Sequence, residues 1–130
     1  MKAFRGEILS VPGDPLDAGP EAVRHYPDGL LLVEDGLVVS CGPFADPGVP
    51  VESVEGIIVP GFIDAHVHYP QTERIASHGE QLLQWLERHI FPAEQAFAEP
   101  EHAAAIAAFF LDELLRNGTT SALVFATVHA

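Results

Sequence analysis

Cysteine and basic residues are scarce in this 130-residue sequence, which has one cysteine and six Lys or Arg residues against nineteen Asp or Glu residues. A single cysteine cannot build an intramolecular disulfide framework, which argues against a small secreted scaffold. The net charge of −13 repels phosphate backbones, so we expect no nucleic-acid partner. The charge balance favours a small neutral or weakly charged ligand.

Long hydrophobic runs are also missing. No apolar run approaches the roughly 18 residues of a membrane span. The first residues, MKAFRGEILSVPGD, lack the apolar core and small-residue cleavage site of a signal peptide. We therefore expect a cytoplasmic protein with no membrane partner. Apolar residues still make up 48% of the sequence, enough for a packed core and against disorder.

The first part of the chain has the pattern of β-structure. MKAFRGEIL predicts one strand, and GLLLVEDGLVVSCG predicts two more around a hairpin turn. The Pro/Gly-rich stretches VPGDPLDAGP and GPFADPGVP predict loops. Because the pattern changes near Gly56 to Pro60, we assign residues 1–57 to an N-terminal β-domain, part of a small β-sandwich. Residues 58–130 form a second unit.

The second unit reads as strand, helices and strand. Phe62 to Val67 is β-compatible, and a helix is expected from Glu80 to Ile90. Pro92 and Pro100 can each open a further helix, because proline fits the first helical position. TTSALVFATVH, after the helix stop at Gly118, predicts a second strand. This order implies a parallel βαβ unit and an α/β fold class. The apolar side of the first helix consists of Leu82, Leu83, Leu86 and Ile90.

The stretch PGFIDAHVHYPQ contains the candidate metal ligands, His66 and His68. Residues two apart on a strand point to the same face, so Asp64 and both histidines share one face. The two histidine Cα atoms are expected about 6.6 Å apart, and their rings can converge on one ion with Zn–N bonds of about 2.0–2.1 Å. Neutral imidazole suits zinc or iron. The opposite, apolar face is expected to pack on helices and consists of Ile63, Ala65 and Val67.

Two interpretations of Asp64 remain open. Its carboxylate could orient a histidine ligand from the second coordination shell, or it could be a structural hydrogen-bonding group below the site. The His-x-His pair is by itself a weak signal, since such pairs also occur on surface strands. An apolar strand that follows Pro60-Gly61 and precedes a loop fits a barrel strand ending at a site.

The same stretch resembles a known family. PGFIDAHVH is similar to the first barrel strand of the amidohydrolase superfamily. HVHYPQ, GEQLLQWLERHIFPAEQAF and LLRNGTTSALVFATVH resemble the guanine deaminases of that superfamily. The resemblance runs from about Val59 to the end. It implies the start of a (β/α)8 TIM barrel with one catalytic zinc, and a homodimeric enzyme of purine catabolism that converts guanine and water to xanthine and ammonia.

The resemblance also implies roles for individual residues. His66 and His68 would be zinc ligands, and Gln71 would contact the purine. Trp85 is either core packing or part of the purine pocket. The further ligands and the proton-transferring glutamate of the family have no counterpart here, so no catalytic residue is assigned. A TIM barrel needs about 250 residues, and we expect the chain to be an N-terminal fragment that is unstable and inactive alone.

Two other functions remain open. The chain could belong to another amidohydrolase, a cytosine- or adenosine-type deaminase or a triazine-type chlorohydrolase, all of which fit His66 and His68. It could also be a non-catalytic remnant that binds a partner. His78 and Glu80 in the loop after the first barrel strand could shape a pocket. His129, at the end of the second strand, is expected to make a structural hydrogen bond.

Overall fold

The computed structural model describes residues 1–77, 79, 81–127 and 129. His78 and Glu80 therefore lie outside the described residues. The chain divides into two compact units, residues 1–60 and residues 61–130. Within the described ranges, no helix combines the length and apolar character needed to cross a membrane.

The first unit is built on one four-stranded sheet with the order β3-β2-β1-β4. β1 pairs antiparallel with β2 and parallel with β4, and β2 pairs antiparallel with β3. The predicted hairpin is confirmed, and its turn residues Asp35 and Gly36 both have positive φ, at 51° and 81°. Such angles match the twist of the flanking strands. The strands are β1 (Lys2–Ser10), β2 (Arg24–Glu34), β3 (Leu37–Pro43) and β4 (Val51–Ile58).

The stretch predicted as a loop between β1 and β2 contains helical turns, so that prediction was wrong. α1 (Pro15–Ala18) is followed by the 3₁₀ turn η1 (Gly19–Ala22). Asp14 caps α1, since its Oδ1 accepts a hydrogen bond of 2.8 Å from the Leu16 N–H. A capping aspartate followed by proline is a strong helix start, even for one turn.

An ion pair links β1 and β2 at the surface. Arg5 donates from Nε and Nη2 to the two carboxylate oxygens of Asp28, at 2.7 and 2.8 Å. The Arg5 guanidinium also lies 3.8 Å from the centre of the Phe44 ring. The hydrogen bond from Arg5 lowers the pKa of the Asp28 carboxyl below its usual value. These contacts stabilise the sheet and lie in the unit without the histidine pair.

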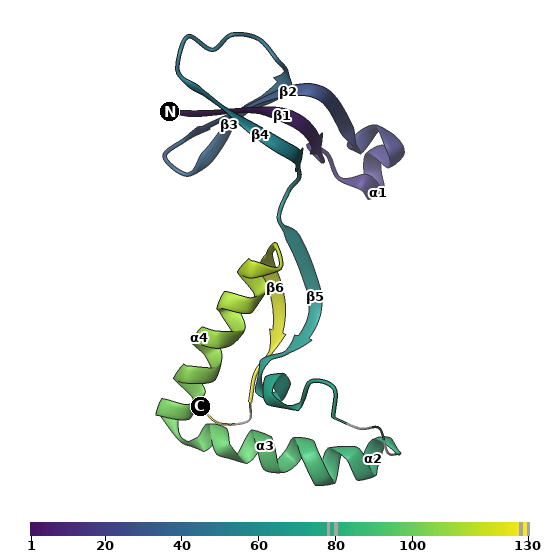
Figure 1. Ribbon diagram of the computed structural model, residues 1–130. Helices are drawn as coiled ribbons and strands as arrows, with labels where there is room; N and C mark the ends of the chain where they lie inside the picture. Colours follow the sequence, from purple (N-terminus) through teal and green to yellow (C-terminus); the bar gives the residue numbers. More distant parts are fainter. Residues whose placement is uncertain (78, 80, 128, 130) are drawn as a thin grey trace. The chain divides into compact units, whose positions relative to one another are not determined.

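The second unit has the predicted strand–helices–strand order. β5 (Phe62–His68) and β6 (Thr119–Phe125) pair in parallel, and α4 (Pro100–Arg116) runs back between them in sequence and beside β6 in space (Figure 1). Gly118 ends α4 with a φ of 80°, which favours glycine. Its carbonyl accepts a hydrogen bond of 2.8 Å from Phe62 N–H, so the helix stop also aligns the two strands.

A continuous helical segment precedes α4. It runs through α2 (Leu82–Trp85), the π-helical turn η3 (Leu86–Ile90), α3 (Phe91–Gln95) and the 3₁₀ turn η4 (Ala96–Ala98), drawn as one coil in Figure 1. As predicted, Pro92 lies at the start of a short helix, α3, although the helical path enters it directly from the π turn. Proline lacks an N–H and clashes in a regular α-helix, and the wider π turn accommodates it.

The buried side of this helical segment agrees only in part with the predicted apolar face. The predicted apolar face was wrong at its start, since Leu82 and Leu83 are 67% and 72% exposed. The half-buried Trp85 is followed by a buried residue five positions later, at Ile90. Leu86 is half-buried and Ile90 is buried, so the second half of the predicted apolar face is confirmed.

The segment after β5 forms a 3₁₀ turn, η2 (Tyr69–Arg74), where only a loop was predicted. Pro70 is fully buried within it. The Tyr69 ring packs against Phe97 with centroids 5.2 Å apart and against Phe110 at 6.0 Å. These contacts of Tyr69 with η4 and α4 hold η2 in place, and with it the position of Gln71.

β6 is shorter than predicted. It ends at Phe125, opposite His68 in the register, because β5 offers no partner beyond that point. His129 therefore does not end the strand, which corrects the prediction. Its backbone N–H donates to Thr127 Oγ1 at 3.2 Å.

The close approach of the two parallel strands predicts that Gly61→Ala destabilises the fold. A Cβ atom at Gly61 would overlap the Thr120 side chain and lie 2.7 Å from its Cβ, which is fixed to the backbone. We expect a loss of about 1–3 kcal/mol, as for other overpacked positions, measured as a lower Tm by circular dichroism. Gly42→Ala is the matched control, since no atom lies within 4 Å. Equal Tm values for the two variants would contradict this account.

Candidate functional site

The two histidine side chains of β5 converge. The Nε2 atoms of His66 and His68 lie 3.2 Å apart, and the ring centroids are 5.0 Å apart. Two nitrogen ligands at about 2.0–2.1 Å from a tetrahedral zinc are about 3.3 Å apart. The same distance lets one neutral ring donate its Nε2–H to the other. The separation of the two Nε2 atoms is therefore compatible both with a hydrogen bond between the rings and with two ligands of one ion.

A register shift of the β-bulge type lies in β5 at the position of His66. The strand pairing passes from Asp64–Ala122 to Val67–Val124, so β5 advances three residues where β6 advances two. The regular alternation of faces is therefore interrupted between Asp64 and Val67. Ile63, which was expected to pack on helices, is 76% exposed, so that prediction was wrong. Bulges are frequent next to functional sites, where they redirect a side chain.

The bulge brings the Asp64 carboxylate to the backbone of the first histidine. Asp64 Oδ1 accepts a hydrogen bond of 3.0 Å from the His66 backbone N–H. The register skips His66, and the carboxylate satisfies its N–H instead. Asp64 is thus connected to His66 through the main chain, and both interpretations given in the sequence analysis remain compatible with this contact.

Phe125 packs against both imidazoles, a contact that the sequence analysis did not identify. Its ring centroid is 4.7 Å from that of each histidine, and its plane is stacked on His68 at 14°. The contact follows from the pairing of His68 with Phe125 in the parallel register. A parallel register has no short connecting turn to fix it, so no signal in the sequence could have revealed this neighbour.

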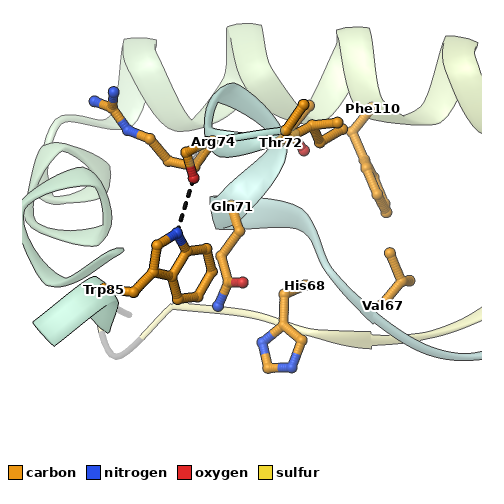
Figure 2. Close-up of a pocket in the computed structure, with 10 residues that line it drawn as sticks. Val67, His68, Gln71, Thr72, Arg74, Trp85 and Phe110 are labelled. Carbon is orange, nitrogen blue, oxygen red and sulfur yellow. Dashed lines mark hydrogen bonds between the residues drawn. The ribbon is translucent and has the colours of Figure 1, made fainter. Parts of the chain in front are cut away.

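A hollow of about 360 Å³ opens beside His68. Gln71 and Trp85, both predicted site residues, lie in its wall together with His68. Figure 2 shows the Gln71 amide pointing into the space between the Trp85 indole and the His68 imidazole. The hollow thus combines a flat apolar wall, an amide with donors and an acceptor, and an imidazole edge.

The indole of Trp85 is held by a residue that the sequence analysis missed. Trp85 Nε1–H donates to Ser77 Oγ at 2.9 Å, drawn as the dashed line in Figure 2. Ser77 follows Ala76, whose φ of 61° turns the chain sharply, and the Ser77 N–H donates to the Arg74 carbonyl at 3.1 Å. Only the spatial fold could reveal this pair, whose members are eight residues apart in the sequence.

The Ser77 contact predicts a fluorescence change in Ser77→Ala. Trp85 is the only tryptophan of the 130-residue chain, so its emission reports directly on this contact. Losing the hydroxyl leaves the part-buried indole N–H without its partner, at a cost of about 1 kcal/mol. We expect emission at longer wavelength and stronger acrylamide quenching. Ser53→Ala, at an exposed position of β4, is the control, and identical spectra for both variants would contradict the contact.

The donor set is incomplete for a catalytic metal. Across the described ranges, no group of three or more His, Cys, Asp or Glu side chains is placed to hold an ion. The histidine pair offers two nitrogen donors, whereas a catalytic zinc takes three protein ligands and a water.

Comparison with known families identifies the chain. Residues 57–130, more than half of the chain, match the Amidohydrolase family. The chain belongs to the amidohydrolase family. Members of this family typically use a metal. The matched segment of this amidohydrolase includes β5, the histidine pair and the residues around the hollow.

Individual relatives extend the likeness to the first unit. This amidohydrolase chain is 44% identical to the guanine deaminase of Escherichia coli (strain K12), over 99% of the chain and 31% of that protein. The solved structure of E. coli guanine deaminase matches with a TM-score of 0.85 at 43% identity, over 99% of this chain and 32% of that one. The chain is thus mixed α/β, like the corresponding part of that enzyme, and spans about a third of its length.

A third relative was solved with a ligand. Guanine deaminase from C. acetobutylicum, with bound guanine in the active site, matches with a TM-score of 0.80 and 28% identity. The match covers 98% of this amidohydrolase chain and 30% of the other chain.

Proposed function

We propose that this chain is the N-terminal part of a guanine deaminase, a hydrolase that converts guanine and water to xanthine and ammonia. The observation that supports the proposal most directly is the convergence of His66 and His68 beside a hollow that carries the Gln71 amide. The 44% identity to a guanine deaminase over nearly the whole chain supports the choice of substrate.

In this proposal His66 and His68 are two ligands of a catalytic zinc, with iron as the other metal suited to imidazole. Bound zinc would supply a nucleophile at neutral pH by lowering the pKa of a water molecule. Asp64 would act from outside the ligand set, through the His66 backbone. The remaining ligands and the glutamate that moves protons would come from outside the described residues.

Gln71 and Trp85 are proposed to recognise the purine. A guanine edge presents both hydrogen-bond donors and acceptors, and the Gln71 amide carries both kinds of group. The Trp85 indole forms a flat apolar surface in the same hollow, which suits a planar heterocycle. Together they would orient the base while His68 lies at the far side of the amide (Figure 2).

The two units would belong to different domains of the proposed protein. The sheet of residues 1–57 would be part of a small β-sandwich. β5, the helices after it and β6 would be the first β/α units of a TIM barrel, in which sites lie at the carboxyl ends of the strands. His68 is the last residue of β5, as this arrangement requires. The single cysteine supports a cytoplasmic location.

Ammonia release by the full-length protein, measured with a panel of bases, tests the proposal. We expect guanine to be the preferred substrate over adenosine, cytosine and a chlorotriazine, and elemental analysis to find about one zinc per chain. Preference for another base would favour a different amidohydrolase. If the full-length protein contains no bound metal and binds no purine, that result would favour a non-catalytic protein. The 130-residue chain alone, tested in parallel, is expected to release no ammonia.

A further inference from the structure

The bulge in β5 coincides with a hydrogen bond between Asp64 and His66, which are two residues apart. Asp64 Oδ1 accepts from the N–H of His66, two residues further on, which is the hydrogen bond of an Asx turn. Such side-chain bonds compete with strand pairing and hold the backbone in a turned path. The carboxylate therefore fixes the peptide between Ala65 and His66, a peptide outside the strand register.

The direction of the His66 side chain depends on this peptide. In an unbroken strand, the Cα atoms of residues two apart are about 6.6 Å apart, so two rings on one face must lean toward each other to reach a common ion. In this structure the Nε2 atoms of His66 and His68 approach to 3.2 Å. Phe125 packs on both rings but carries no polar group, so it cannot hold the His66 peptide.

We propose that Asp64 is a positioning residue: its carboxylate holds the bulge that brings the His66 ring into line with the His68 ring. This inference rests on the metal site of the proposed function. The part that matters is the acceptor oxygen on the His66 N–H, and the negative charge of Asp64 is not required. Asparagine keeps an acceptor oxygen at the same reach, whereas alanine has none.

The test compares Asp64→Asn and Asp64→Ala in the full-length protein, with Asp112→Ala as a matched control on the exposed surface of α4. Zinc affinity is measured by competition with a chromophoric chelator. We expect Asp64→Ala to weaken zinc binding by about 10–100-fold, the cost of losing an outer partner of a metal ligand. Asp64→Asn should stay within about threefold of the unsubstituted protein, because its hydrogen bond persists.

The visible spectrum of the Co²⁺-substituted protein is the second measurement, because it reports ligand geometry independently of overall stability. We expect the absorption bands of Asp64→Ala to shift or weaken and those of Asp64→Asn to be retained. Thermal unfolding, recorded in parallel, separates a local change at His66 from general destabilisation.

Several outcomes would overturn the inference. If Asp64→Ala binds zinc as tightly as Asp112→Ala, with an unchanged Co²⁺ spectrum, Asp64 does not position His66. If Asp64→Asn loses as much zinc affinity as Asp64→Ala, the negative charge of Asp64 supports zinc binding and its hydrogen bond to the His66 N–H does not. If the unsubstituted protein binds no zinc, the proposed function fails instead, and the two failures are distinct.

Discussion

Replacing His68 with alanine in the full-length protein is expected to abolish stoichiometric zinc binding and to lower kcat/KM for guanine by more than about 100-fold. Loss of an outer partner of a metal ligand costs about 10–100-fold, and loss of the ligand itself removes a direct bond. The Nε2 atoms of His66 and His68 lie 3.2 Å apart. Removing one of these rings leaves the other imidazole without a second nitrogen donor beside it. Elemental analysis and steady-state kinetics measure the two effects, and His66→Ala should behave alike.

His25→Ala is the matched control for these histidine variants. His25 lies in the first unit, where its Nε2 pairs with Glu7 Oε1 at 2.8 Å on the exposed surface. Zinc content and kcat/KM should stay close to those of the unsubstituted protein. Retained zinc and activity in His68→Ala would refute the role of the pair, and an equal loss in His25→Ala would mean that the effect is not local.

Gln71→Met is expected to impair the full-length enzyme through substrate binding. Methionine approximates the length of glutamine but offers no N–H donor or carbonyl acceptor, so the polar edge of guanine would be buried without partners. An unsatisfied buried group costs about 1–3 kcal/mol, which corresponds to roughly a 5–150-fold loss in kcat/KM. Most of this loss should appear as a higher KM, while the zinc content stays unchanged because Gln71 holds no metal in this proposal.

The matched control for this variant is Gln95→Met, at the exposed end of α3. A KM for guanine that is the same in both variants would exclude Gln71 from recognition. A loss of zinc in Gln71→Met would also contradict the assignment, since it would place the residue in the metal site.

Local patterns predicted much of this structure. The Asp35-Gly36 turn, the start of α4 at Pro100 and its end at Gly118 each have a short-range cause: glycine conformations and the fixed φ of proline. The histidine pair was found because an i, i+2 spacing on a strand has one geometric meaning. These features depend on residues close together in sequence, so the sequence alone was sufficient.

The features that were missed depend on contacts between distant residues or on broken periodicity. The bulge at His66 is set by pairing with β6, more than fifty positions later in the chain. Phe125 reaches the imidazoles through the same parallel register. Ser77 contacts Trp85, which lies eight positions later in the chain. An α-helical period could not foresee the π turn of Leu86–Ile90, and the exposure of Leu82 and Leu83 was not predicted either.

The π turn of Leu86–Ile90 also constrains how the length of this segment can vary. Each residue of a regular helix rotates the following part by about 100°. A π turn closes over one residue more than an α turn, so it takes up an extra residue without rotating the helix on either side of it. Deleting one residue within Leu86–Ile90 should therefore convert the π turn to an α turn and keep both Trp85 in the hollow and Phe97 against Tyr69. A second deletion has no wide turn left to absorb it and should separate one of these side chains from its neighbours.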